Sequence, residues 1–126
     1  MSEVYPNYPD VVLGIVIVDC LEPQQLAVFW SELLGRRIVR SREDWVDLEW
    51  APRFAAGLCF QRVNHPKTGK NRVHVDILCA DLQATAKRVE ELGGRRAEGY
   101  GSNPQVIVML DPEGNEFCLV PKPGGG

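Results

Sequence analysis

The sequence predicts an α+β domain of two βαβββ repeats. Their strands form a curved mixed sheet, or half-barrel, around a shared cavity, with the helices outside. Three observations lead to this fold class. The chain has 126 residues, which is enough for one domain with a core and leaves little room for a second. Each half reads as a strand, a helix and three further short strands. The two halves also match each other at one fixed offset.

The offset is 59 residues, the number that separates Cys59 from Cys118. The other matches are Val16 with Val75, Cys20 with Cys79, Gln24 with Gln83, Ala27 with Ala86, Glu32-Leu33 with Glu91-Leu92, and Gly35-Arg36-Arg37 with Gly94-Arg95-Arg96. Because one offset holds from the first helix to the last strand, the matches indicate an internal duplication.

The first repeat, residues 11–63, begins with an apolar run over 11–18 that is typical of a buried strand. Apolar side chains then recur at helical spacing over 26–34, and Gly35 ends this helix as its C-cap. Trp30 lies on the apolar face of the helix and is expected in the core. Three short strands complete the repeat, at 37–42, 45–50 and 57–63.

The second repeat, residues 71–121, keeps the same order. A strand at 71–79 and a helix at 82–92 precede strands near 95–99, 105–110 and 115–120. Between the last two strands, Asp111-Pro112-Glu113-Gly114 has the Pro and Gly positions that a type I turn prefers. The remaining segments are predicted to be an N-terminal arm at 1–10, an exposed linker at 64–70 and a flexible tail at 122–126.

Composition and charge exclude several function classes. The net charge of −3 gives no sign of the basic face that nucleic-acid binding requires. The longest apolar run, 11–18, is too short to cross a bilayer, and the N-terminus does not resemble a signal peptide, so we expect a cytoplasmic protein without membrane contact. The four cysteines, Cys20, Cys59, Cys79 and Cys118, are interpreted as reduced thiols in or near the core.

Four segments carry a resemblance to a known family: the helix 26–35, the strand 72–77 (RVHVDI), the helix end 90–94 (EELGG) and the segment 110–120 (LDPEGNEFCLV). In these segments the chain resembles glyoxalase-like domains of the glyoxalase/bleomycin-resistance, or vicinal-oxygen-chelate, superfamily. The resemblance implies a small organic ligand and a homodimer whose chains often complete each other's cavities. It leaves the chemistry open, because this superfamily includes isomerases, dioxygenases, epimerases, thiol transferases and non-catalytic drug-binding proteins.

Metal-using relatives place ligands on the first and last strand of each repeat. By this resemblance the second repeat supplies His74 and Glu116, which can share a divalent transition metal. The offset places Ile15 and Gly57 at the matching positions of the first repeat, and neither side chain can coordinate. The nearest alternatives on the same strand faces are Asp19, Cys59 and Gln61. Because a catalytic metal usually has three protein ligands, we favour no cofactor, with zinc, nickel, iron or manganese as the alternative.

Four other residues are candidates for the site. Asp76 shares a strand face with His74, and the two can act as an acid–base pair; the alternative is a salt bridge from Asp76 to Arg72 or Lys70. Trp45 and Trp50 bracket one strand on opposite faces, so one is expected under the helix and the other at the cavity or a dimer surface. Tyr100, in a Gly-rich turn, is either a lid over the cavity or part of an ordinary surface loop.

The first functional hypothesis is a metal-independent protein that binds a small molecule, for example to sequester a drug or metabolite. Its predicted ligand site comprises His74, Asp76, Glu116, Trp45, Trp50, Cys59, Gln61 and Tyr100. The alternative is a lyase, isomerase or dioxygenase-type enzyme that uses His74 and Glu116 with or without a divalent metal, or His74 and Asp76 for proton transfer. A regulatory or accessory domain is the third hypothesis.

Overall fold

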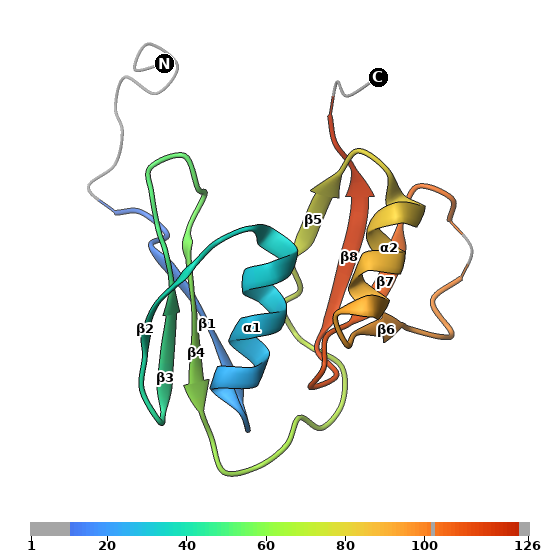
Figure 1. Cartoon of the computed structure of the whole chain (residues 1–126). Helices are drawn as coiled ribbons and strands as arrows, with labels where there is room; N and C mark the ends of the chain where they lie inside the picture. The colour runs from blue at the N-terminus through green and yellow to red at the C-terminus, as the bar shows by residue number, and fades with distance from the viewer. Residues whose placement is uncertain (1–10, 102, 124–126) are drawn as a thin grey trace.

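The computed structural model describes residues 11–101 and 103–123, so the predicted arm 1–10 and the last three residues of the predicted tail lie outside the described residues. Its elements are β1 (Ile15–Cys20), α1 (Pro23–Leu34), β2 (Ile38–Ser41), β3 (Trp45–Leu48), β4 (Gly57–Arg62), β5 (Asp76–Cys79), α2 (Leu82–Glu91), β6 (Arg95–Arg96), β7 (Ile107–Leu110) and β8 (Glu116–Pro121). This order is βαβββ twice, which confirms the predicted α+β class and the two repeats (Figure 1). None of the described helices is long and apolar enough to span a membrane.

Each repeat forms a four-stranded mixed sheet, in the order β1-β4-β3-β2 in the first and β5-β8-β7-β6 in the second. The first and last strands pair in parallel with the same register: Ile17 lies opposite Cys59, and Asp76 lies opposite Cys118. The offset of 59 residues therefore relates both pairs, as the sequence predicts. The third strands of the two repeats, β3 and β7, do not keep this offset. Cys59 lies opposite Asp47 on β3, whereas Cys118 lies opposite Val108 on β7, and these two partners are 61 residues apart (108 − 47).

Several predicted strands are shorter than expected. The first begins at Ile15 and not at residue 11, because β4 begins at Gly57 and offers no partner strand to the residues before Ile15. The strand predicted at 71–79 begins only at Asp76. The reason is local, since Asn71 uses both its backbone and its side-chain N–H groups to bind Glu116. The strands predicted at 45–50 and 95–99 also end early, at Leu48 and Arg96.

The two helices end and begin as their sequences indicate. Pro23 occupies the first turn of α1, where its missing N–H costs nothing. Gly35 caps the other end with a φ of 67°, a left-handed conformation that suits glycine, and donates its N–H to the carbonyl of Ser31. At the start of α2, the Asp81 carboxylate accepts the N–H of Ala84.

A single hydrophobic core joins the repeats, and α1 lies between the two sheets (Figure 1). Trp30 is buried, as predicted, with its ring centroid 4.8 Å from that of Phe117 on β8 of the other repeat. Phe29 contacts the same ring at 6.2 Å. Aromatic edge contacts of this kind stabilise a core beyond the area they bury. The repeats therefore form one packed unit.

The turn 111–114 provides a second link between the repeats. Asp111, which is fully buried, accepts hydrogen bonds from the Trp30 indole N–H at 3.1 Å and from Asn115. Glu113 accepts the backbone N–H groups of Leu21 and Glu22, each at 2.8 Å. Because α1 has no side-chain cap of its own, this carboxylate from the second repeat satisfies donors at the start of the first helix.

Candidate functional site

Each sheet packs one face on the core and leaves the other face without a covering helix. We call the second face the open face. On the first sheet, Val46, Leu48 and Phe60 point to the core, so alternation places Trp45, Asp47, Cys59 and Gln61 on the open face. On the second sheet, Met109, Phe117 and Leu119 point to the core, and His74, Asp76, Glu116 and Cys118 share the open face. Most of the predicted site residues therefore lie on the two open faces.

Three ligand-type side chains converge on the second open face. The His74 Nε2 atom lies 3.7 Å from Asp76 Oδ1, and both side chains are about half exposed, at 45% and 53%. Cys118, on the adjacent strand, places its sulfur so that one donor atom from each of the three residues lies within 4.8 Å of the others. Burial raises the pKa of the Cys118 thiol, and the charge of Asp76 adds to the rise while Lys70 opposes it. Asp76 thus lies beside His74, and among the described residues it makes no salt bridge to Arg72 or Lys70.

Glu116 belongs to a different group of contacts. Its carboxylate accepts the Asn71 N–H at 2.9 Å, lies 3.2 Å from the Lys67 ammonium, and is 3.5 Å from the Tyr100 hydroxyl. Burial alone would raise the pKa of Glu116, but the hydrogen bonds from Asn71 and from its own N–H, together with Lys67, outweigh it and hold the pKa below its usual value. With a side chain only 10% exposed, Glu116 anchors the linker to β8.

The first open face is organised around Asp47, a residue that the sequence analysis did not select. Its carboxylate accepts the Cys59 thiol at 2.9 Å and the Trp45 indole N–H, and lies 3.7 Å from Arg40. Burial opposes ionisation, but these partners together lower the pKa of Asp47. Burial also raises the pKa of Cys59 to about 12, with Asp47 adding to the rise. The signal for Asp47 was available, since it lies two residues after Trp45 on the same strand.

Trp45 and Trp50 both border the open face. Trp50 is 56% exposed and follows the end of β3. A Cβ atom built on Gly57 would lie 3.7 Å from Trp50 Cδ1 and 3.3 Å from Ile15 Cγ1, which places Trp50 beside the open face. The prediction that one tryptophan packs under the helix is therefore wrong, because strand alternation ends at Leu48 and does not extend to Trp50.

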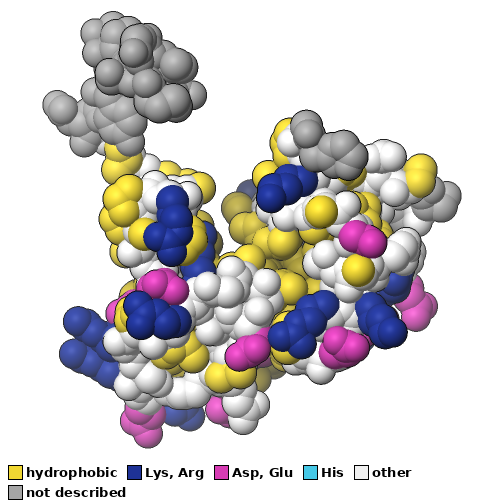
Figure 2. Space-filling model, turned by 45° about the horizontal axis from the view of Figure 1, so that its top comes forward, with side chains coloured by type: hydrophobic (Ala, Val, Ile, Leu, Met, Phe, Trp, Pro, Cys, Tyr) yellow, Lys and Arg dark blue, Asp and Glu magenta, His cyan; other side chains and the backbone are white. Residues whose placement is uncertain are grey.

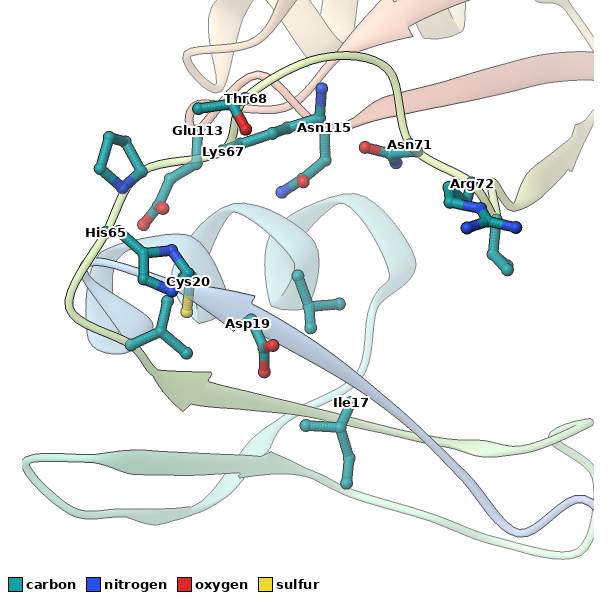
Figure 3. Close-up of a pocket in the computed structure, with 14 residues that line it drawn as sticks. Ile17, Asp19, Cys20, His65, Lys67, Thr68, Asn71, Arg72, Glu113 and Asn115 are labelled. Atoms are coloured by element: carbon teal, nitrogen blue, oxygen red, sulfur yellow. The ribbon is translucent and has the colours of Figure 1, made fainter.

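Two hollows flank these faces. The linker arches over β1 beside a polar hollow of about 520 Å³, with His65 near Cys20 at one end and Arg72 at the other (Figure 3). Asp19 and Glu113 also line this hollow. An apolar hollow of about 460 Å³ lies between the repeats; its lining includes Val16, Val18, Trp30, Leu34, Leu58 and Ile77, and Figure 2 shows hydrophobic side chains gathered between the two halves. Asp76 lines the apolar hollow, and Asp19, one of the alternative metal ligands, lines the polar one.

The fold and the paired repeats of this chain occur in known proteins. The family model of the glyoxalase-like domain matches residues 15–120. The chain belongs to this family. The glyoxalase-like domain family falls within the glyoxalase/bleomycin-resistance/dioxygenase, or vicinal-oxygen-chelate, superfamily, as the resemblance of the sequence implies. No curated protein sequence matches the chain.

Solved structures share the fold at low identity. A glyoxalase/bleomycin-resistance protein/dioxygenase family enzyme from Burkholderia phytofirmans PsJN superimposes with a TM-score of 0.69 at 13% identity, over 86% of this chain and 97% of that one. The bleomycin-binding protein of Streptomyces verticillus, complexed with copper(II)-bleomycin, superimposes with a TM-score of 0.60 at 14% identity. The match covers 90% of this chain and 98% of that one. The oxidase ChaP-H2 superimposes with a TM-score of 0.66 at 20% identity, over 94% of this chain and 100% of that one. These likenesses show a shared fold.

This glyoxalase-like domain does not offer the metal ligands that the resemblance implies. The positions in its first repeat hold Ile15 and Gly57, which face each other across β1 and β4. In the second repeat, the Glu116 carboxylate is engaged by Lys67 and Asn71. The residues present therefore do not fit a four-ligand metal centre that spans both repeats.

Proposed function

We propose that this glyoxalase-like domain binds a small organic molecule on its open faces, without a metal centre spanning both repeats. The proposal rests on the kinds of side chain that these faces expose. Each combines a few polar groups with apolar or aromatic surface, and neither is covered by a helix. Trp45 and Trp50 offer flat rings, and Ile15 and Ile17 remain 55% and 47% exposed. Such surfaces, with a small number of polar anchors, are typical of ligand sites.

The same surfaces support a homodimer. β1 and β5 are edge strands of their sheets, and exposed large apolar side chains gather on them or just before them: Val11, Val12, Leu13, Ile15, Ile17, Val73, Val75 and Leu78. An exposed apolar edge strand tends to pair with another chain. A second copy can cover these edges and close each open face into a deeper site.

Sequestration of a drug or metabolite is the form of binding that we favour. Binding alone requires shape, apolar surface and anchors, all of which the open faces offer. The structural similarity to a protein whose structure holds copper(II)-bleomycin is consistent with this form.

A catalytic role is the alternative, and the His74–Asp76 pair favours it. An imidazole 3.7 Å from a carboxylate, both partly exposed, can transfer protons to or from a bound substrate. A lyase, isomerase or dioxygenase-type reaction would then use this pair, with or without a divalent metal. The similarity to an oxidase is compatible with such a role.

Tryptophan fluorescence and thermal shift with a panel of aromatic and antibiotic-like compounds test the proposal on the metal-stripped protein. We expect at least one compound to quench the fluorescence and raise the melting temperature. Trp45→Leu should weaken this binding, whereas Val28→Ala, on the exposed side of α1, should not. His74→Ala should only weaken binding if the protein sequesters its ligand, but should abolish turnover if it is an enzyme. If no compound binds the metal-stripped protein, the proposal fails.

A further inference from the structure

We propose that the second repeat binds a divalent transition-metal ion of the zinc class through His74, Asp76 and Cys118, at a site contained within one sheet. The site lies on the open face, where β5 and β8 run in parallel and Asp76 lies directly opposite Cys118. His74 lies two residues before Asp76, just ahead of β5, and its Nε2 atom lies 3.7 Å from Asp76 Oδ1. The segment that leads into β5 and the paired strands β5 and β8 therefore bring an imidazole, a carboxylate and a thiol together.

The distances suit a small tetrahedral ion. With metal–ligand bonds of about 2.0–2.3 Å, two donors on a tetrahedral zinc lie about 3.3–3.8 Å apart. The His74 and Asp76 donor atoms already meet this separation at 3.7 Å. All three donor atoms lie within 4.8 Å of one another, so a movement of the Cys118 side chain of about 1 Å completes the set.

The donor types select the metal. A nitrogen, an oxygen and a sulfur donor favour zinc and related transition metals over calcium or magnesium, which take oxygen ligands. Three protein ligands also leave a fourth position for water or a ligand atom. On binding, the ion forms a bond to the Cys118 sulfur and the thiol proton passes to solvent, so no oxidant or reductant is needed.

The donors are also available. Among residues 11–101 and 103–123, His74 and Asp76 contact only each other among charged partners, at 3.7 Å, and no hydrogen bond engages the Cys118 thiol. Both His74 and Asp76 are open to solvent, so an ion can reach them.

The first repeat provides an internal comparison. It has the matching thiol, Cys59, and a carboxylate, Asp47, that lie 2.9 Å apart. However, Ile15 and Ile17 occupy the positions that match His74 and Asp76. Within the described parts of the two repeats, the second alone combines three donors, and the proposed site differs from a centre whose ligands come from both repeats. It also does not depend on the proposed organic ligand.

Cobalt(II) titration of the reduced, metal-stripped full chain tests the site directly. We expect one equivalent of cobalt per chain, with the charge-transfer absorption of a cobalt–thiolate bond, and its displacement by zinc. Cys118→Ser should abolish this absorption. His74→Ala should lower cobalt affinity by about tenfold or more, because losing a ligand costs at least as much as losing a second-shell partner. Cys59→Ser is the matched control and should keep both the absorption and the affinity.

Several outcomes would overturn the site. These are cobalt binding without thiolate absorption, absorption that survives Cys118→Ser, or absorption that disappears in Cys59→Ser. If Cys118→Ser does not fold, Asp76→Asn replaces it, and an unchanged cobalt affinity in that variant counts against the site. Because no organic compound is present, failure here leaves the proposed function intact, and a failed compound panel leaves this site intact.

Discussion

Asp111 shows how one residue can connect two repeats. Burial raises the pKa of Asp111, while hydrogen bonds from Asn115, Trp30 and Glu113 oppose the rise. A buried carboxylate is tolerated only when such donors satisfy it. The donors come from α1 in the first repeat and from the turn in the second, so their geometry depends on correct docking of the repeats.

Glu116 makes the free energy of unfolding depend on pH. Its pKa is lower in the folded chain, so the unfolded chain binds the proton more readily. Its contribution to the free energy of unfolding is therefore present above the usual carboxyl range and is lost as the pH falls through its folded pKa.

We expect Glu116→Gln to lower the free energy of unfolding by about 1–3 kcal/mol at neutral pH, because the charge-assisted bonds to Asn71 and Lys67 are lost. The difference from the unmodified chain should shrink as the pH falls through the folded pKa. Urea unfolding at several pH values measures it. Glu32→Gln, at a carboxylate that is 57% exposed, controls for the change in net charge. A difference that does not vary with pH would contradict this account of Glu116.

At the scale of elements, the close approach of α2 to β7 depends on Gly94. A Cβ atom on this residue would lie 2.6 Å from Val89 Cγ1 and 2.7 Å from the Leu110 carbonyl oxygen. Both atoms belong to packed elements, so neither can move away without disturbing the core.

Gly94→Ala is expected to lower the free energy of unfolding by about 1–3 kcal/mol, the usual cost of overpacking a core. Gly14→Ala is the matched control, because a Cβ at Gly14 meets nothing within 4 Å. Thermal and urea unfolding of the two variants compare the sites. Equal stability of the two variants would show that the α2–β7 packing yields more easily than the distances indicate.

At the scale of the whole molecule, the exposed edges of both sheets predict self-association. Ile15→Glu places a charge on the β1 edge and should weaken the proposed homodimer, because a buried unpaired charge is costly at an interface. Val28→Glu, on the outer side of α1 with a similar 52% exposure, should leave association unchanged. Sedimentation velocity across a range of concentrations distinguishes the two. A chain that remains monomeric at high concentration would refute the dimer.

The sequence predicted the elements well where the pattern is local. The bounds of α2, β2, β4, β7 and β8 fall within two residues of those predicted. Helical spacing, strand alternation and turn residues each depend on neighbours along the chain, so they can be recognised without tertiary contacts. The pattern failed at two strand starts: before Ile15, where β4 offers no partner, and before Asp76, where Asn71 binds Glu116.

The amino-acid sequence alone predicted a duplicated α+β domain, because one offset relates the first strand, the helix and the last strand of its two halves, and helical and strand periodicities recur in both. It also determined that the polar groups matching His74 and Asp76 are absent from the first repeat. Which donors lie close together became evident from the folded chain. The meeting of Cys118 with His74 and Asp76, and of Asp47 with Cys59, depends on the pairing of separate strands. The contact of Trp30 with Asp111 depends on docking between the repeats, which no local pattern encodes.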